Sequence, residues 1–363
     1  MQLRPVRPLA LLAAAAVLAL GLPVLAQPAI GQPAVSGAET APSGDAAAPV
    51  VRQPWWSAFE DTRLDALMVP LQSPAAGDPA AVLQAQADTV RAYALLRVAG
   101  VRLHNARQRQ QVAEQRQLAL QTAEEASATT RRAAARGLRE ARQQVERLQA
   151  EQLARVAEVA TRLRSRHPAE ILGPLLRGAS EDTQVLLPRF HLMDELPGVV
   201  LRRRPDVARV EASLAPVGRG LGADALDLAR YLQAMSLPIR ASEQPPRMLR
   251  LAWPGVGSVM EQARQEVAFH LWQLGAATVA TREQHAHVAR LAQLWQHLRD
   301  QQQAGRVGEL QVLDAMDEAL QAEDQLAASA GELVRAWVAL QLSVGGAGRT
   351  ELESLLEQDA PAR

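Results

Sequence analysis

The chain has 363 residues, with 39 basic and 39 acidic side chains, and every basic residue other than histidine is arginine. It contains no cysteine, which excludes a disulfide scaffold, a cysteine-ligated metal centre and a cysteine-nucleophile enzyme. The net charge of zero disfavours a strongly basic nucleic-acid-binding protein. Aromatic residues make up only 3% of the chain and alanine is abundant, so we expect closely packed helices rather than a thick globular core.

The first 26 residues have the pattern of a secretory signal peptide, in which Arg4 and Arg7 precede an apolar run. The residues before Ala26 fit the small-residue rule, so we place cleavage after Ala26. The apolar run is shorter than the roughly 20 residues of a membrane span, which leaves a membrane anchor as the weaker alternative. Residues 27–53 are rich in proline, alanine and glycine and predict a flexible linker. The sequence thus indicates export, without a lipid-modified cysteine at the cleavage site.

Proline positions and apolar spacing predict the helices of the remaining chain. At a rise of about 1.5 Å per residue, the first long helix would be roughly 70 Å long, which exceeds the diameter of an ordinary domain. Residues 168–204 and 216–257 carry many prolines and glycines and are predicted to be irregular. The predicted helices, in chain order, are 61–70, 88–136, 138–166, a short helix that begins at Pro205, 259–303 and 309–345.

The two halves of the chain repeat the same order of elements and, in places, the same letters. The segment Leu148-Gln-Ala-Glu-Gln-Leu-Ala154 matches Leu320-Gln-Ala-Glu-Asp-Gln-Leu-Ala327, roughly 170 residues later, a period too long for a solenoid. Chance similarity between alanine-rich segments is the alternative to a duplication. We predict a mainly α fold of two tandem repeats of long antiparallel helical hairpins, with little or no β-hairpin. The predicted repeats are residues 54–200 and 201–346, followed by a loose tail at 347–363.

Four segments, in this order along the chain, carry a resemblance to a known family. They are Pro54-Trp-Trp-Ser-Ala-Phe-Glu-Asp-Thr-Arg-Leu64, Asp194-Glu-Leu-Pro-Gly-Val-Val-Leu-Arg-Arg-Arg-Pro-Asp-Val207, Gly308-Glu-Leu-Gln-Val-Leu-Asp-Ala315 and Val338-Ala-Leu-Gln-Leu-Ser-Val-Gly-Gly346. Together they resemble the TolC-like outer-membrane efflux family, in particular its NodT-type branch. The second segment is the most specific and resembles the linker between the two family repeats. Its motif residues here are Leu196, Pro197, Arg203, Arg204, Pro205 and Asp206.

The resemblance implies a homotrimer whose long helices form a hollow periplasmic barrel and through which small molecules pass passively. It also implies two partners, a periplasmic adaptor that touches the turns between the long helices and an inner-membrane pump. By position, these turns are Arg136-Gly137-Leu138 in the first repeat and the segment with Gly305 and Gly308 in the second. Glycine permits close approach of another backbone, but a helix break that serves folding alone is an equal alternative.

The chain departs from the family where membrane strands should lie. Residues 69–87 and 216–257 occupy these places, and neither has the alternating apolar run of about 9–11 residues that a membrane strand needs. The sequence thus indicates deleted or eroded β-barrel segments. Two hypotheses follow: an outer-membrane-factor-like conduit, or a barrel-less paralogue that acts as a periplasmic helical interaction protein without transport. Either would reside in the outer membrane or periplasm of a Gram-negative bacterium.

The sequence shows no constellation for catalysis or for binding a metal or cofactor, and we expect no enzyme activity. His285 and His287 are two residues apart, so on a helix they point in different directions. The triplet Arg202-Arg203-Arg204 could bind phosphate, although a solvated turn whose charge is answered by Asp206 is the simpler interpretation. No nucleic-acid partner is expected.

The tryptophans divide into two groups. Trp55 and Trp56 form an aromatic cluster that could be an interfacial anchor or a hydrophobic plug. Trp295 and Trp337 fall on apolar helical stripes and are predicted to belong to the core.

Overall fold

The computed structural model describes residues 54–71, 78–123, 126–163, 185–190, 194–214, 224–241 and 255–346. The predicted signal peptide with its cleavage after Ala26, the linker at 27–53 and the tail at 347–363 lie outside the described residues.

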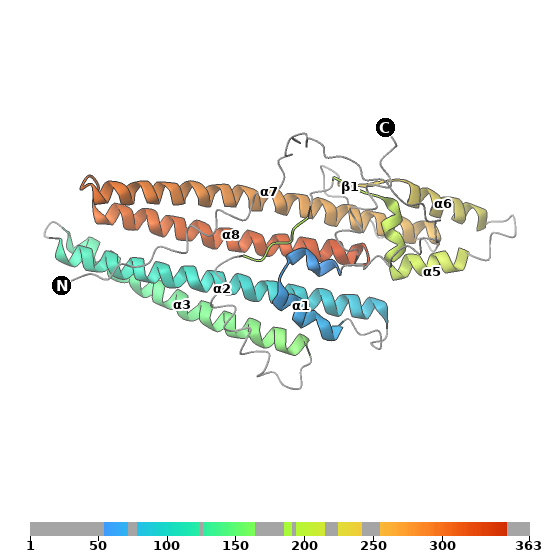
Figure 1. Ribbon diagram of the computed structural model, residues 1–363, viewed down its shortest axis with the longest axis horizontal. Helices are drawn as coiled ribbons and strands as arrows, with labels where there is room; N and C mark the ends of the chain where they lie inside the picture. Colours follow the sequence, from blue (N-terminus) through green and yellow to red (C-terminus); the bar gives the residue numbers. More distant parts are fainter. Residues whose placement is uncertain are drawn as a thin grey trace, which may run out of the picture. The chain divides into compact units, whose positions relative to one another are not determined.

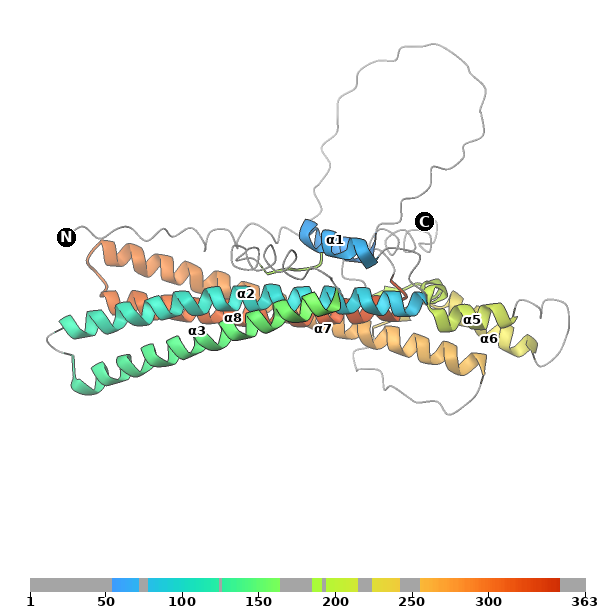
Figure 2. The ribbon, with the colours of Figure 1, turned by 90° about the horizontal axis from the view of Figure 1, so that it is seen from below.

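Four long helices dominate the described part of the chain: α2 (Pro79–Thr122), α3 (Ala128–Arg162), α7 (Val256–Gln303) and α8 (Glu309–Ser343). Helices α2 and α3 pack as one antiparallel hairpin, α7 and α8 pack as another, and α2 also packs along α8. The four therefore form a layer in the order α3, α2, α8, α7 (Figure 1, Figure 2). The predicted fold class, mainly α with two long helical hairpins, is confirmed.

The shorter elements lie before and between the hairpins. Among the described residues, the two strands are β1 and β2, which pair antiparallel with Glu195 opposite Arg240 and Leu196 opposite Ile239. The shorter elements are η2 (Trp55–Phe59), α1 (Thr62–Met68), η3 (Val69–Leu71), β1 (Glu195–Leu196), η4 (Gly198–Arg203), α5 (Pro205–Leu214), α6 (Asp224–Ser236) and β2 (Ile239–Arg240).

The hydrophobic core is large at one end of the long helices and thin toward the two hairpin turns. The main cluster takes its residues from the start of α2 and α7 and from the end of α3 and α8, together with the short elements. Toward the turns only small clusters remain, such as Val112 with Leu313 and Leu320. Small residues allow close helix packing here, since a Cβ at Gly331 would lie only 3.4 Å from Val98. Because only one end of the long helices has a thick core that large side chains must fill, the chain needs few aromatic residues.

One predicted helix boundary and one predicted irregular segment are wrong, because local helix signals were stronger than the turn signals. Helix α2 begins at Pro79 rather than near residue 88, because the Asp78 side chain accepts a hydrogen bond from Ala80 N (3.2 Å) and proline is favoured in the first helical turn. Helix α6 lies within the segment that was predicted to be irregular. Its apolar side is recognisable in Tyr231 and Met235, which are buried four residues apart.

The opening aromatic cluster is part of the core. Trp55 and Trp56 are 2% and 4% exposed and meet edge to face, so within this chain they belong to the core rather than to an exposed interfacial anchor. A role as a plug of a helical barrel stays a prediction. Trp295 and Trp337 are buried, as predicted. None of the described helices is both long enough and apolar enough to traverse a lipid bilayer.

Asp61 joins this opening segment to α2. Its side chain caps α1 by accepting hydrogen bonds from Arg63 N and Leu64 N. Its second oxygen accepts hydrogen bonds from Tyr93 Oη and Arg97 Nη1, each at 2.9 Å. The pKa of Tyr93 is raised to about 12, and burial of the side chain is the largest cause. The phenol therefore stays protonated and donates its hydrogen bond to Asp61.

Candidate functional site

The predicted inter-repeat linker, between the two hairpins in the chain, runs from β1 through η4 to the start of α5. Leu196 is buried in β1, Pro197 precedes η4 and Pro205 is the first residue of α5. Gly198 packs against the end of α6 so closely that a Cβ there would lie 2.5 Å from the carbonyl oxygen of Ala234. Glycine is therefore required at this position by the approach of another backbone.

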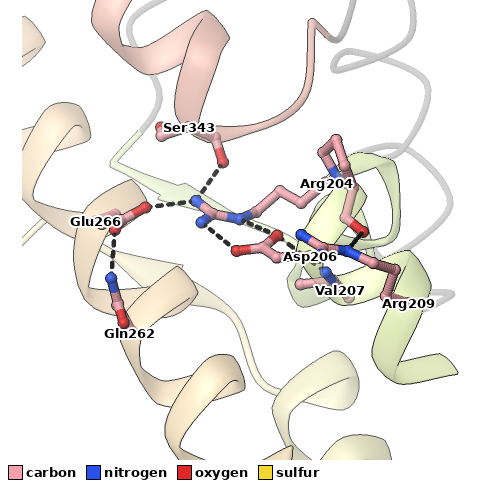
Figure 3. A network of polar contacts seen from close by, with 8 residues as sticks. Arg204, Asp206, Val207, Arg209, Gln262, Glu266 and Ser343 are labelled. Carbon is pink, nitrogen blue, oxygen red and sulfur yellow. Dashed lines mark hydrogen bonds and ion pairs between the residues drawn. The ribbon is translucent and has the colours of Figure 1, made fainter. Parts of the chain in front are cut away.

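Arg204 is the centre of a polar network that ties this linker to both helices of the second hairpin (Figure 3). Its Nε and Nη2 donate to the two carboxylate oxygens of Asp206, at 3.0 and 2.7 Å. Its Nη1 donates to Glu266 of α7 at 2.7 Å and to the Ser343 carbonyl at the end of α8 at 3.0 Å. The two parallel hydrogen bonds from the guanidinium group of Arg204 to the carboxylate of Asp206 form a bidentate ion pair, which is stronger than a single neutral hydrogen bond.

Arg204 is only 9% exposed, so its charge is stabilised by its partners rather than by water. Burial alone would disfavour the charged form of Asp206, but the hydrogen bonds and positive charge of Arg204 outweigh it and lower the pKa of that carboxyl. The expectation that Asp206 neutralises the charge of the arginine triplet agrees with its ion pair to Arg204. The expectation of a solvated turn is wrong for Arg204. Because its donors are already engaged, it is not available to a phosphate ligand.

The closing glycines of α8 pack against the same linker. Gly345 and Gly346 have φ angles of +78° and +77°, and their N–H groups donate to Leu342 O and Gln341 O to end the helix. A Cβ at Gly345 would lie 2.6 Å from the carbonyl oxygen of Arg203, whose Nη1 in turn donates to Gly346 O at 3.4 Å. The second and fourth family-like segments are therefore in contact.

The predicted turn of the first hairpin is in the wrong place. Residues Arg136, Gly137 and Leu138 lie inside α3, and the chain reverses between the end of α2 at Thr122 and the start of α3 at Ala128. Gly137 does not break the helix because a single glycine weakens a long helix without ending it. Leu138 is buried and α3 packs along α2, so burial of this side chain favours the helical conformation of the segment.

Two side chains build the observed turn of the first hairpin. Ser127 caps α3 by accepting a hydrogen bond from Thr130 N at 3.1 Å. Arg131 reaches back across the turn and donates to Leu120 O and Ala123 O, at 3.0 and 2.8 Å, which satisfies carbonyl groups at the end of α2. The serine before a run of helix formers was the sequence signal for this boundary.

The second hairpin turn lies where the sequence predicts it, between Gln303 and Glu309. Gly305 has a φ angle of +69°, and the N–H groups of Gly305 and Arg306 donate to Gln302 O and Gln301 O, both at 2.9 Å. Gly308 is the residue before α8. The role of Gly305 and Gly308 in docking an adaptor stays a prediction.

A seam of ion pairs, which the sequence interpretation missed, joins the hairpins along α2 and α8. Arg102 pairs with Asp324 at 3.0 Å, Arg109 pairs with Asp317 at 2.8 Å, and Arg116 pairs with Asp314. The arginines recur every seven residues, which places them on one face of α2. This heptad spacing, opposite an acidic stretch of α8, was the available signal.

The same acidic stretch contains Glu323, which is half-buried in α8. Burial raises the pKa of Glu323 to about 7. This residue is therefore a titratable group within the helical layer. Within the described ranges, no group of three or more acidic or histidine side chains is placed to hold a metal ion.

Solved structures resemble the described arrangement. The chain is similar to the outer-membrane channel OprN with 20% sequence identity, 87% of this chain and 99% of that chain covered, and a TM-score of 0.53. It is also similar to a membrane protein from Pseudomonas aeruginosa, with 16% identity, 83% and 73% coverage and a TM-score of 0.52. No protein-family model and no curated protein matches the chain. The chain therefore has the fold of the outer-membrane channel OprN, as its resemblance to the TolC-like outer-membrane efflux family implies.

Proposed function

We propose that the protein is an outer-membrane-factor-like component of a tripartite efflux or secretion system. In this role it is a passive conduit for small molecules, and its hairpin turns dock a periplasmic adaptor that connects it to an inner-membrane pump. The observation that carries the proposal is the fold likeness to OprN, which extends over 87% of the chain. The proposed location is the outer membrane of a Gram-negative bacterium, after removal of the signal peptide.

The open edges of the four-helix layer support a homotrimer. In the described part of the chain, α3 packs along only one other long helix, α2, and α7 along only α8. Both edge helices expose large apolar side chains, with Leu153 of α3 at 53% and Val279 of α7 at 50%. A contact between α3 of one copy and α7 of the next would be head to tail, and such contacts form a ring when the rotation between copies closes. Three copies are the number that the family resemblance implies.

The experiment that tests this proposal is membrane fractionation of a host that produces the full-length chain. We expect the protein in the outer-membrane fraction as a trimer that resists mild heating in detergent. A deletion strain should become more sensitive to at least one toxic small molecule, and the intact chain should restore resistance. A soluble periplasmic monomer would contradict the conduit and favour the alternative of a helical interaction protein without transport.

A further inference from the structure

Gln341 is a buried amide near the end of α8 whose side chain has no hydrogen-bond partner in the described part of the chain. The residue is 0% exposed, and neither Nε2 nor Oε1 of its amide forms a hydrogen bond there. Polar groups inside proteins are almost always hydrogen-bonded, either to the protein or to ordered water, because burial without a partner is unfavourable. The amide of Gln341 therefore calls for a ligand inside the core.

The indole of Trp337 supplies a second unpartnered group on the same side of α8. Trp337 lies four residues before Gln341, and helical residues at this spacing face the same way, with Cβ atoms about 5–6 Å apart. Side chains on a helix lean toward its N-terminus, so the side chain of Gln341 leans toward Trp337. Trp337 is 2% exposed, and its Nε1 also has no partner among the residues that the structure describes. The two side chains are thus neighbours that do not bond to each other.

The surroundings of this pair are apolar. Phe190 stacks on the indole of Trp337, with ring centroids 4.8 Å apart and an interplanar angle of 20°. Val338 and Leu340, which lie between Trp337 and Gln341 in α8, belong with Trp337 to the main hydrophobic cluster. Bulk water does not reach the amide, so a ligand that satisfies it has to be enclosed by the core.

Trp55 lies near the same end of α8 but on the far side of Gln341. The N–H group of Gly346 donates to Gln341 O at 2.8 Å, where the helix ends. A Cβ at Gly346 would lie 3.3 Å from Cδ1 and 3.8 Å from Nε1 of Trp55, so this indole packs beyond the helix end. The side chain of Gln341 leans the other way, toward Trp337. Trp55 is therefore the residue with which the role of Trp337 can be compared.

The chemistry of the pair selects water as the ligand. Nε1 of Trp337 and Nε2 of Gln341 donate hydrogen bonds, while Oε1 of Gln341 accepts them. A cation would face two N–H groups, and an anion would face the amide oxygen. A water molecule can accept from the donors and donate to the oxygen, and buried waters typically form about three such hydrogen bonds.

We propose that Gln341 and Trp337 hold an internal water molecule in the core near the end of α8. The water bridges the indole N–H group of Trp337 to the amide of Gln341. This site lies away from the hairpin turns and from the open edges of the layer, and the inference does not rest on the proposed function. Its consequence is that Gln341 is a satisfied polar group of the core.

The direct test is a crystal structure of the full-length chain at a resolution that shows ordered water. We expect a water molecule within about 2.7–3.2 Å of both Trp337 Nε1 and the amide of Gln341. The variant Trp337→Phe removes one donor and should lose this water, whereas Trp55→Phe should keep it. A direct hydrogen bond between Gln341 and Trp337, or loss of the water in Trp55→Phe alone, would overturn the proposal.

A stability measurement tests the same site through the sign of its result. Gln341→Met keeps the length of the side chain and removes both polar atoms. If water satisfies the amide, this change leaves the Trp337 donor without its bridge and should lower the melting temperature by about 2–4 °C. A higher melting temperature would contradict the site, because it would mean that Gln341→Met had removed two unsatisfied polar atoms. The matched control Gln325→Met, at an exposed glutamine of α8, should change the melting temperature by less than about 1 °C.

Combined variants test whether the two side chains share one water. In a chain that already carries Trp337→Phe, the change Gln341→Met should lower the melting temperature by less than in the unaltered chain, because no indole donor is left without its bridge. In a chain that carries Trp55→Phe, the loss caused by Gln341→Met should be the same as in the unaltered chain. An equal loss in the Trp337→Phe background would show that Gln341 and Trp337 do not share a ligand.

Discussion

The guanidinium group of Arg204 and the carboxylate of Glu266 lie 2.7 Å apart, although 62 residues separate them in the chain. This contact joins the residue before α5 to α7, and the second Nη1 bond of Arg204 to Ser343 O extends it to α8. The linker between the repeats is therefore fixed to the base of the second hairpin. The arginine-proline-aspartate segment that marks the family resemblance has a structural role in this chain.

Replacement of Arg204 by leucine should strongly destabilise the protein. Removal of one partner of a fully buried pair costs about 3–5 kcal/mol. The side chains of Asp206 and Glu266 are 36% and 22% exposed, so the loss should lie at or below the lower end of that range. Urea unfolding followed by circular dichroism measures the loss. The control Arg209→Leu alters an exposed arginine of α5 and should change the free energy of unfolding by less than about 0.5 kcal/mol. Similar losses in the two variants would show that Arg204 does not hold the linker.

Alanine substitutions at two glycines should have opposite effects on stability. A Cβ at residue 198 would lie 2.5 to 2.7 Å from three carbonyl oxygens at the end of α6, so Gly198→Ala should lower the melting temperature. Gly137→Ala should raise the stability by about 0.5–1 kcal/mol, because the residue is helical and its Cβ enters open space. Differential scanning calorimetry of both variants checks the pair. If Gly198→Ala melts like the unaltered protein, the close approach between η4 and α6 is wrong.

Glu323 should make stability depend on pH near neutrality. Its pKa is raised from 4.5 to about 7 in the folded chain, so the folded state favours the protonated carboxyl. The associated stability is fully present below pH 4.5 and is lost as the pH rises through about 7. Glu323→Gln should therefore stabilise the protein at pH 8 relative to the unaltered chain, by at most about 3 kcal/mol. At pH 4 the two chains should unfold at similar urea concentrations, and an identical difference at both pH values would contradict the burial of this carboxyl.

The seam between α2 and α8 should contribute modestly and respond to salt. The side chains of Arg109 and Asp317 are each about one-third exposed, so their coupling energy should be no more than about 1 kcal/mol. A double-mutant cycle with Arg109→Gln and Asp317→Asn measures this coupling, which should shrink in 1 M sodium chloride. A coupling energy of zero at low salt would mean that the pair of Arg109 and Asp317 does not help to join these helices.

The sequence predicted the long helices well because their apolar positions recur at three and four residues over many turns. Helix ends were harder to predict, since single side chains decide them. Ser127 and Arg131 build a turn that Gly137 seemed to offer. The pairing of Arg204 with Glu266 could not be inferred, because nothing local in the chain links two residues so far apart. The partial burial of Glu323 likewise depends on packing that emerges only when the hairpins meet.

The claim on which the proposed function depends is that copies of the layer close into a ring through α3 and α7. The chain lacks cysteine, so thiols can be introduced at Leu153 and Val279, which are exposed on these two edges, without interference from native thiols. The most direct measurement is thiol-specific crosslinking of the double variant L153C/V279C in membranes, followed by denaturing electrophoresis. We expect covalent species up to a trimer and no larger, while either single variant stays monomeric. A double variant that remains monomeric in the same membranes would contradict the ring.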